Sequence, residues 1–395
     1  MDGWPFDRTL PSSQARFASA RVLKNRAAHS QTSVRTLVIT LFQYKSVVNS
    51  LELYRMAHYG PHSGALCMPL RMSRRGFIAG IGALATTMQT PRWFATSFSQ
   101  TAVQLSKSPF RIAVINDEIS QDFDHACHVA SRQFGMQWIE LRSMWNTNVV
   151  KLTSKQVAET KRILKQNGLS VTDIASPLFK VDWPGAPKSK FSPKHDQFNA
   201  DFTFAQQDEV LERSIELAKV FETDRVRCFD FWRLDEQGPY RAPMDETLHK
   251  AAEKAGKNNV MLILENEPAC NTATAFEAAR VLGAVKSKHL MLNWDPGNAA
   301  SHGEKAYPDG YNLLPKNRIS HCHCKDVIRK ADGFEWAAMG HGEIDWVGQF
   351  KALKRDGYHG AVSLETHWRG AGTPEDSTAQ SWAGMKDELQ RAGAL

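Results

Sequence analysis

Four side chains of metal-binding type each follow or end a short apolar run: Glu265, Asp295, His323 and Glu365. Intervals of 30, 28 and 42 residues separate them, which leaves room each time for a strand, a helix and two loops. In a closed parallel barrel the carboxyl ends of all strands meet at one face, so distant residues can surround one ion. Three carboxylates and an imidazole favour Mn²⁺, Mg²⁺ or Co²⁺, with catalytic Zn²⁺ also compatible, over a structural zinc held by thiolates.

Two histidines alternate with two cysteines in the stretch SHCHCKD at residues 320–326. Residues two apart on a strand share a face, so His321 and His323 point one way and Cys322 and Cys324 the other. We expect the histidines to face the barrel interior and the cysteines to be buried packing residues, which argues against a soft-metal tract. Strand parity alone leaves open which of the two histidines is the metal ligand.

Strand-like and helix-like segments alternate from residue 110 onward, which predicts an α/β fold of the (β/α)8 TIM-barrel type. The strands are expected at 110–115, 135–142, 170–175, 224–231, 260–264, 289–294, 318–322 and 361–364. The helices are expected at 122–134, 154–166, 206–220, 244–255, 273–285, 347–355 and 377–392. A proline-containing insertion at 179–202 is expected to form a loop over the site. The barrel would be a single catalytic domain at 108–393.

The first hundred residues have a different character. Residues 72–105 begin with an arginine pair, Arg74 and Arg75, before a modest apolar stretch with glycines. This layout predicts a twin-arginine export signal and linker, and hence a periplasmic or exported protein that contacts the export machinery transiently. Because such signals normally start a chain, residues 1–71 are predicted to be an upstream or disordered, non-globular extension. Without the signal the protein would be cytoplasmic. No stable membrane association is expected.

The net charge of +7 over 395 residues comes from the amino-terminal part. Residues 1–75 carry 11 Lys or Arg against 3 Asp or Glu, so residues 76–395 carry 38 against 39. The predicted barrel is therefore close to neutral. It lacks the basic composition that a nucleic-acid-binding domain usually has, so no nucleic-acid partner is expected.

Several successive motifs resemble the xylose isomerase-like TIM barrels, the sugar phosphate isomerase and epimerase family. They are Leu264–Asn266, Asp295–Asn298, His321–Asp326, Met339–Trp346 and Ser363–His367. The resemblance extends over essentially the whole predicted barrel. It implies one divalent metal held by the four residues named first, and it favours His323 over His321 as the imidazole ligand.

The resemblance also implies an activity, isomerisation or epimerisation of a sugar or sugar derivative through an enediolate. A divalent cation stabilises the charge of such an intermediate, while one group removes a proton and another returns it. Glu265 and Glu365 are the expected proton-transfer pair. The competing assignment makes both of them ligands only and gives proton transfer to Glu140, Lys325 or His367.

Further residues are candidates for substrate binding: Asn298, Lys325, Glu140, Arg142 and His367. Lys325 would suit an enediolate or a carboxylate, so the expected substrate is a sugar or a sugar acid. Pocket aromatics such as Trp145, Phe179 and Trp232 could stack on a sugar ring. Two alternatives stay open, a phosphodiesterase resembling endonuclease IV and a sugar-binding barrel without catalysis. The oligomeric state is not predicted.

Overall fold

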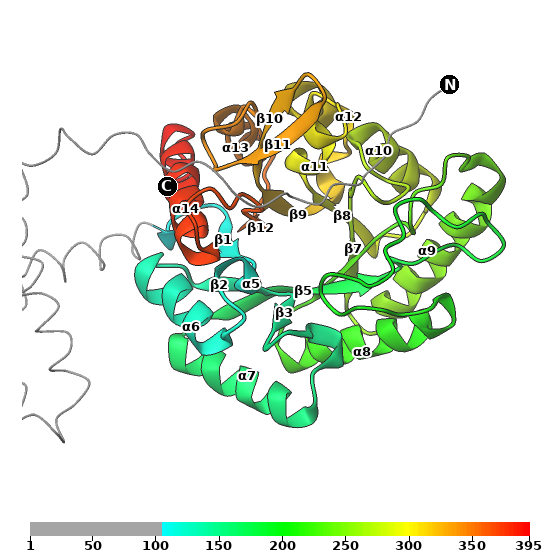
Figure 1. Cartoon of the computed structure of the whole chain (residues 1–395), viewed down its shortest axis with the longest axis horizontal. Helices are drawn as coiled ribbons and strands as arrows, with labels where there is room; N and C mark the ends of the chain where they lie inside the picture. The colour runs from blue at the N-terminus through cyan, green and yellow to red at the C-terminus, as the bar shows by residue number, and fades with distance from the viewer. Residues whose placement is uncertain (1–104) are drawn as a thin grey trace, which may run out of the picture. The chain divides into compact units, whose positions relative to one another are not determined.

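Eight parallel strands form a closed barrel in the computed structural model, which describes residues 105–395 (Figure 1). The strands are β1 (Arg111–Val114), β2 (Trp138–Leu141), β5 (Ser170–Leu178), β6 (Arg225–Cys228), β7 (Met261–Glu265), β8 (Leu290–Trp294), β9 (Ile319–Cys324) and β12 (Ala361–Leu364). They are hydrogen-bonded in the order β1-β12-β9-β8-β7-β6-β5-β2. A parallel bridge between Ile115 and Glu140 joins the two ends of this sheet. The predicted barrel class is therefore confirmed.

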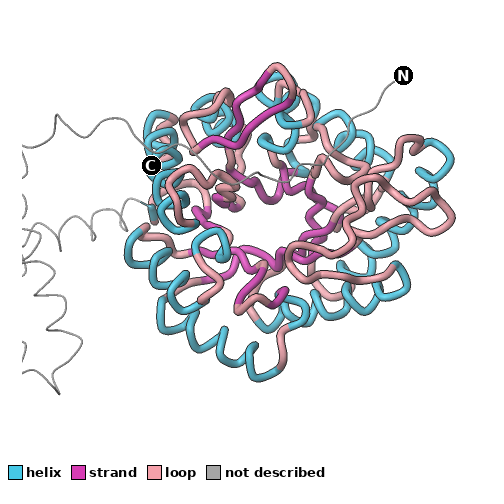
Figure 2. Tube along the Cα trace, viewed as in Figure 1, coloured by secondary structure: helices cyan, strands magenta, loops and turns pink. Residues whose placement is uncertain are grey.

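Helices surround the ring of strands, as Figure 2 shows. They are α5 (Asn116–Ile119), α6 (Phe123–His128), α7 (Ser154–Asn167), α8 (Gln207–Val220), α9 (Arg241–Gly256), α10 (Ala275–Ala284), α11 (Pro296–Ser301), α12 (Tyr311–Leu313), α13 (Trp346–Arg355) and α14 (Pro374–Arg391). Local sequence sets their ends, as in α7. The Thr153 side chain accepts a hydrogen bond from the Gln156 backbone N–H, and Gly168 ends the helix with a φ of 66°. A left-handed residue of this kind is most easily supplied by glycine.

Several strand ends differ from the prediction by one to three residues, and those of β6 and β5 are two examples. β6 stops at Cys228 rather than at residue 231, and Phe231 has a φ of 56°, which extended backbone does not adopt. β5 continues to Leu178 rather than ending at residue 175. All of its residues after Ser170 are buried, so no polar alternation marks its end in the sequence.

Two short hairpins that the sequence did not predict extend from the carboxyl end of the barrel. β10 (Asp326–Lys330) pairs antiparallel with β11 (Gly333–Ala337), and β3 (Ser143–Met144) pairs with β4 (Thr147–Asn148). Residues 179–203 contain no helix or strand, which confirms the predicted loop. The β3–β4 hairpin follows β2, the loop follows β5, and the β10–β11 hairpin follows β9. All three begin at the carboxyl end of the barrel, where the candidate ligands lie.

The core lies between the strands and the helices. Cys322 and Cys324 are fully buried in the main hydrophobic cluster, as predicted, while His321 and His323 face the barrel interior, where both contact Glu140. Among residues 105–395 no helix is long and apolar enough to cross a membrane. The predicted extension and nearly all of the predicted export signal, residues 1–104, lie outside the described residues and stay predictions.

Candidate metal centre

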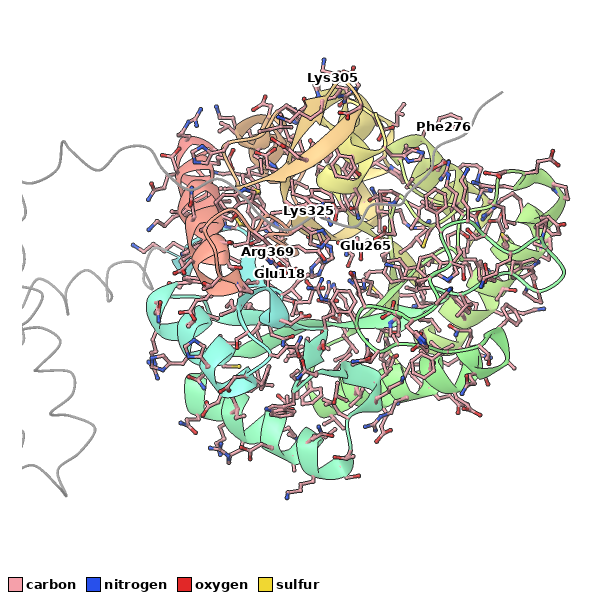
Figure 3. All side chains as sticks on the ribbon, viewed as in Figure 1. Glu118, Glu265, Phe276, Lys305, Lys325 and Arg369 are labelled. Carbon is pink, nitrogen blue, oxygen red and sulfur yellow. The ribbon has the colours of Figure 1, made fainter. Side chains whose placement is uncertain are left out.

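The four predicted ligands meet at the carboxyl end of the barrel. Glu265 ends β7, Asp295 follows β8, His323 lies in β9, and Glu365 follows β12. Each offers one ligand atom within 4.8 Å of the others, and none of the four is more than 3% exposed. Figure 3 shows Glu265 and Lys325 near the middle of the ring of strands. Four separate βα units therefore contribute to one buried cluster.

The His323 imidazole organises the cluster. Its Nδ1 lies 3.2 Å from Glu365 Oε2 and 3.5 Å from both Glu265 Oε1 and Asp295 Oδ2. Three buried carboxylate oxygens around one imidazole nitrogen form a donor set suited to a divalent cation. The described residues therefore fit the predicted metal.

The Nε2 side of the His323 imidazole faces a row of buried polar groups that contact one another. His323 Nε2 lies 3.1 Å from Glu140 Oε1, and His321 Nε2 lies 3.2 Å from Glu140 Oε2. His321 Nδ1 is in turn 3.6 Å from Asp173 Oδ1. Since metal-bound histidines commonly donate their second N–H to a carboxylate, Glu140 is placed to fix the orientation of His323. Glu140 and His321 are fully buried.

Cationic side chains contact the carboxylates of the cluster. Arg142 donates to Glu365 at 2.6 Å, to Glu118 at 2.7 Å and to Asp117 at 2.9 Å. Burial alone would raise the pKa of the Glu365 carboxyl, but Lys325 and the nearby histidines hold that pKa well below its ordinary value. The Glu365 side chain is therefore a charged carboxylate, the form that binds a cation.

The remaining two carboxylates have their own cationic neighbours. Arg227 Nη1 is 3.1 Å from Glu265 Oε2, and Lys325 Nζ is 2.8 Å from Asp295 Oδ2. Burial opposes ionisation of Glu265, yet His323 and Arg227 outweigh it and lower its pKa to about 2. The charges around Glu265 therefore hold its buried carboxylate ionised.

The predicted substrate-binding residues fall into three positions. Arg142 and His367 line a cavity of about 30 Å³ beside Glu265 and Glu365. Lys325 and Asn298 are buried behind it. Lys325 contacts Glu365 at 2.5 Å, and Asn298 donates to Glu265 at 3.2 Å. Glu140, as described above, contacts the two histidines and does not line this cavity.

Sequence reasoning missed several charged residues of the site: Asp117, Glu118, Asp173, Lys180, Arg227 and Glu267. Two signals were available. Asp117 and Glu118 lie in α5, three and four residues after the end of β1, at the same end of the barrel as the chosen ligands. Arg227 alternates with apolar residues in β6, so a charge on a buried strand could have been assigned to the barrel interior. Lys180 and Glu267 lie in loops, where no spacing rule applies.

The fold and the ligand cluster together define a TIM barrel whose site lies at the carboxyl ends of its strands. The sequence matches the xylose isomerase-like TIM barrel family over residues 129–388. The chain belongs to this family. No curated protein matches the chain.

Solved structures of the same fold include proteins with different names. A D-psicose 3-epimerase with D-tagatose from Clostridium cellulolyticum H10 is 15% identical over 72% of this chain and 98% of its own, with a TM-score of 0.52. A probable 3-DHS dehydratase, AsbF, from Bacillus anthracis is 20% identical over 70% and 98%, with a TM-score of 0.53. A xylose isomerase-like TIM barrel protein from Mycobacterium smegmatis in complex with magnesium is 16% identical over 73% and 98%, also at 0.53. At these identities the likeness shows the fold alone.

Proposed function

We propose that this protein is a divalent-metal-dependent isomerase or epimerase of a sugar or sugar derivative. The observation that carries the proposal is the pairing of Glu265 and Glu365 around His323 at the wall of a cavity. Two carboxylates from different strands can approach one small molecule from two directions. Proton removal and proton return at one carbon need two such groups.

The metal would be held by the four clustered residues and would stabilise negative charge on neighbouring substrate oxygens. Glu265 and Glu365 would exchange the proton at the carbon next to the carbonyl. Arg227 and Arg142 hold the outer oxygens of these carboxylates at 3.1 and 2.6 Å, which fixes their orientation. Burial keeps bulk water away from the carbanion-like centre.

The test is exchange of a carbon-bound proton with solvent. The full chain would be loaded with Mn²⁺ and incubated in D2O with ketoses and keto-acids, and deuterium at the carbon beside the carbonyl would be followed by NMR. We expect incorporation by the natural protein and a loss of about 10³-fold or more in Glu365→Gln, the size expected for removal of a proton-transfer group that is also a ligand. Glu277→Gln, in a loop-supporting ion pair with Arg233, is the matched control.

Metal content separates the alternatives that remain open. One ion per chain together with deuterium incorporation supports the proposal. Two or three ions per chain, with cleavage of abasic DNA, would support the phosphodiesterase instead. Sugar binding without any incorporation, in protein that carries its metal, would leave the non-catalytic barrel. A Glu365→Gln variant that keeps its metal but exchanges normally would assign Glu365 no part in proton transfer.

A further inference from the structure

A second, larger cavity adjoins the one beside the candidate ligands. It has a volume of about 360 Å³ and lies between the loop at 192–204 and Trp232. Three residues line both cavities, namely Lys180, Asp196 and Ala200. The two spaces are therefore separated by side chains of one short turn and one lysine.

The sizes of the two cavities differ in a way that matters for a substrate. The inner cavity of about 30 Å³ has room for only about two waters, whereas small-molecule sites usually span about 300–1,000 Å³. Its cover is the turn at 196–200, whose Phe198 ring lies 4.3 Å from the Arg142 guanidinium. Because Lys180, Asp196 and Ala200 line both cavities, displacement of this turn by a ligand would join the inner and outer cavities.

The walls of the outer cavity have the chemistry of a carbohydrate site. Phe204 and the largely buried Trp232 line this cavity, and so do Asp182 and Asp196, whose carboxylates also accept hydrogen bonds from the Ser192 hydroxyl and the Ala200 backbone N–H. Aromatic faces suit the C–H surface of a sugar ring, and carboxylates suit its hydroxyl groups. This combination favours a ring with many hydroxyl groups over a purely apolar group.

Lys180, which lines both cavities, has more hydrogen-bond donors than its protein neighbours use. Arg142 and Arg227, the neighbouring guanidiniums, use all of their nitrogens on carboxylates or backbone carbonyls. The Lys180 ammonium has one carboxylate neighbour, Glu267 at 3.5 Å, and lies 4.6 Å from the centre of the Phe229 ring. An ammonium has three donors, so two stay available to oxygens of a ligand that passes between the cavities.

We propose that the substrate is a two-unit carbohydrate, with its reacting sugar at the metal centre and a second sugar ring in the outer cavity. Lys180 binds oxygens near the linkage between the two units, and Trp232 stacks on the second ring. The proposal rests on the function proposed above and adds the substrate class, a sugar that carries another ring.

The experiment compares a ketose with the same ketose extended by one sugar. Fructose and maltulose, a glucosyl-fructose, would be assayed with the Mn²⁺-loaded full chain by deuterium incorporation from D2O. We expect kcat/KM for maltulose to exceed that for fructose by about tenfold or more, and this ratio to fall towards one in Trp232→Ala and Lys180→Met. Trp138→Ala, at the opposite end of the barrel where β2 begins, is the matched control and should keep the ratio.

The possible failures are distinguishable. Incorporation into fructose and maltulose at equal rates would overturn the two-unit substrate and leave the proposed function intact. If neither sugar exchanges, calorimetric titration of the metal-loaded protein with glucose and with cellobiose still tests the outer cavity. Tighter binding of cellobiose that is lost in Trp232→Ala supports the second-ring site, and equal binding overturns it. Circular dichroism of each variant excludes loss of folding as the cause.

Discussion

Buried carboxylates occur in two regions of this molecule. Those in the first region have cationic partners, and those in the second do not. At the carboxyl end of the barrel Glu265, Asp295 and Glu365 each have a lysine or arginine within 3.1 Å. At α14, Glu388 and its neighbour Asp326 are also buried, but neither forms an ion pair within the described chain, and Glu388 Oε2 has no hydrogen-bond partner there.

Burial acts on the carboxylates of both regions, and their different neighbours make the charge differ. Burial and its acidic neighbour Asp326 raise the pKa of Glu388 to about 8, whereas His323 and Arg227 lower that of Glu265 to about 2 despite its burial. Asp326 is intermediate, with a pKa of about 6, because burial is partly offset by backbone N–H donors. Ionised, converging carboxylates suit a cation, whereas the carboxyl of Glu388 holds its proton at neutral pH.

The largest change in the free energy of unfolding should come from removing the Arg142 guanidinium, which balances buried carboxylates at the carboxyl end of the barrel. Arg142→Met leaves Asp117, Glu118 and Glu365 without their shared guanidinium in a buried position. We expect the free energy of unfolding of the metal-free protein to fall by about 3–5 kcal/mol, as found when one partner of a buried ion pair is removed. Urea unfolding at neutral pH measures this change.

A surface arginine provides the control for that variant. Arg162 pairs with Glu159 three residues away, and both side chains are about half exposed. Arg162→Met should leave the free energy of unfolding nearly unchanged, because an exposed ion pair adds little to stability. If both arginine variants lose the same small amount, the contrast between the two regions is wrong, because the mouth of the barrel would then tolerate an unbalanced carboxylate.

Much of this contrast could be predicted from sequence, and the reason is the regularity of the barrel. Parallel strands bring their carboxyl ends together, so Glu265, Asp295 and Glu365 could be placed at one site from strand positions alone. Strand parity also placed Cys322 and Cys324 in the packing layer correctly. The loop at 179–202 was recognised from its prolines, although its sequence does not reveal the cavity it encloses.

The cationic partners could not be derived in the same way. Arg142 contacts Glu365 across 223 positions of sequence, through the closure of the barrel between β1 and β2, which no local pattern encodes. Glu140, near the end of β2, was only one candidate for substrate binding. Its register with Ile115 directs it inward to His321 and His323. A shift of one residue would have reversed its direction, and sequence alone fixes register poorly.

An intermediate effect is expected from the carboxylate behind His323. Glu140→Gln removes the charge that would stabilise the N–H of the metal-binding imidazole, so the affinity for Mn²⁺ should fall by about 10–100-fold. Calorimetric titration of the metal-free protein with Mn²⁺ measures it. Asp173→Asn, one step further along the row of buried polar groups through His321, should have a smaller effect. A lower stability of Glu140→Gln with unchanged Mn²⁺ affinity would restrict Glu140 to a structural role.

The smallest effect, expressed as a change per pH unit, should come from the second region. Burial raises the pKa of Glu388 in the folded protein to about 8 from its ordinary value of 4.5, so the folded state holds its proton where the unfolded state releases it. The stabilising contribution is fully present below pH 4.5 and is lost as pH rises through 8. Glu388→Gln keeps a neutral side chain at every pH, so its free energy of unfolding should rise relative to that of the natural protein by up to about 1.4 kcal/mol per pH unit between pH 5 and pH 8. Urea unfolding of both proteins across this range measures the difference. A difference that stays constant with pH would mean that Glu388 is ionised in the folded state like the carboxylates at the barrel mouth, and the contrast between the two regions would disappear.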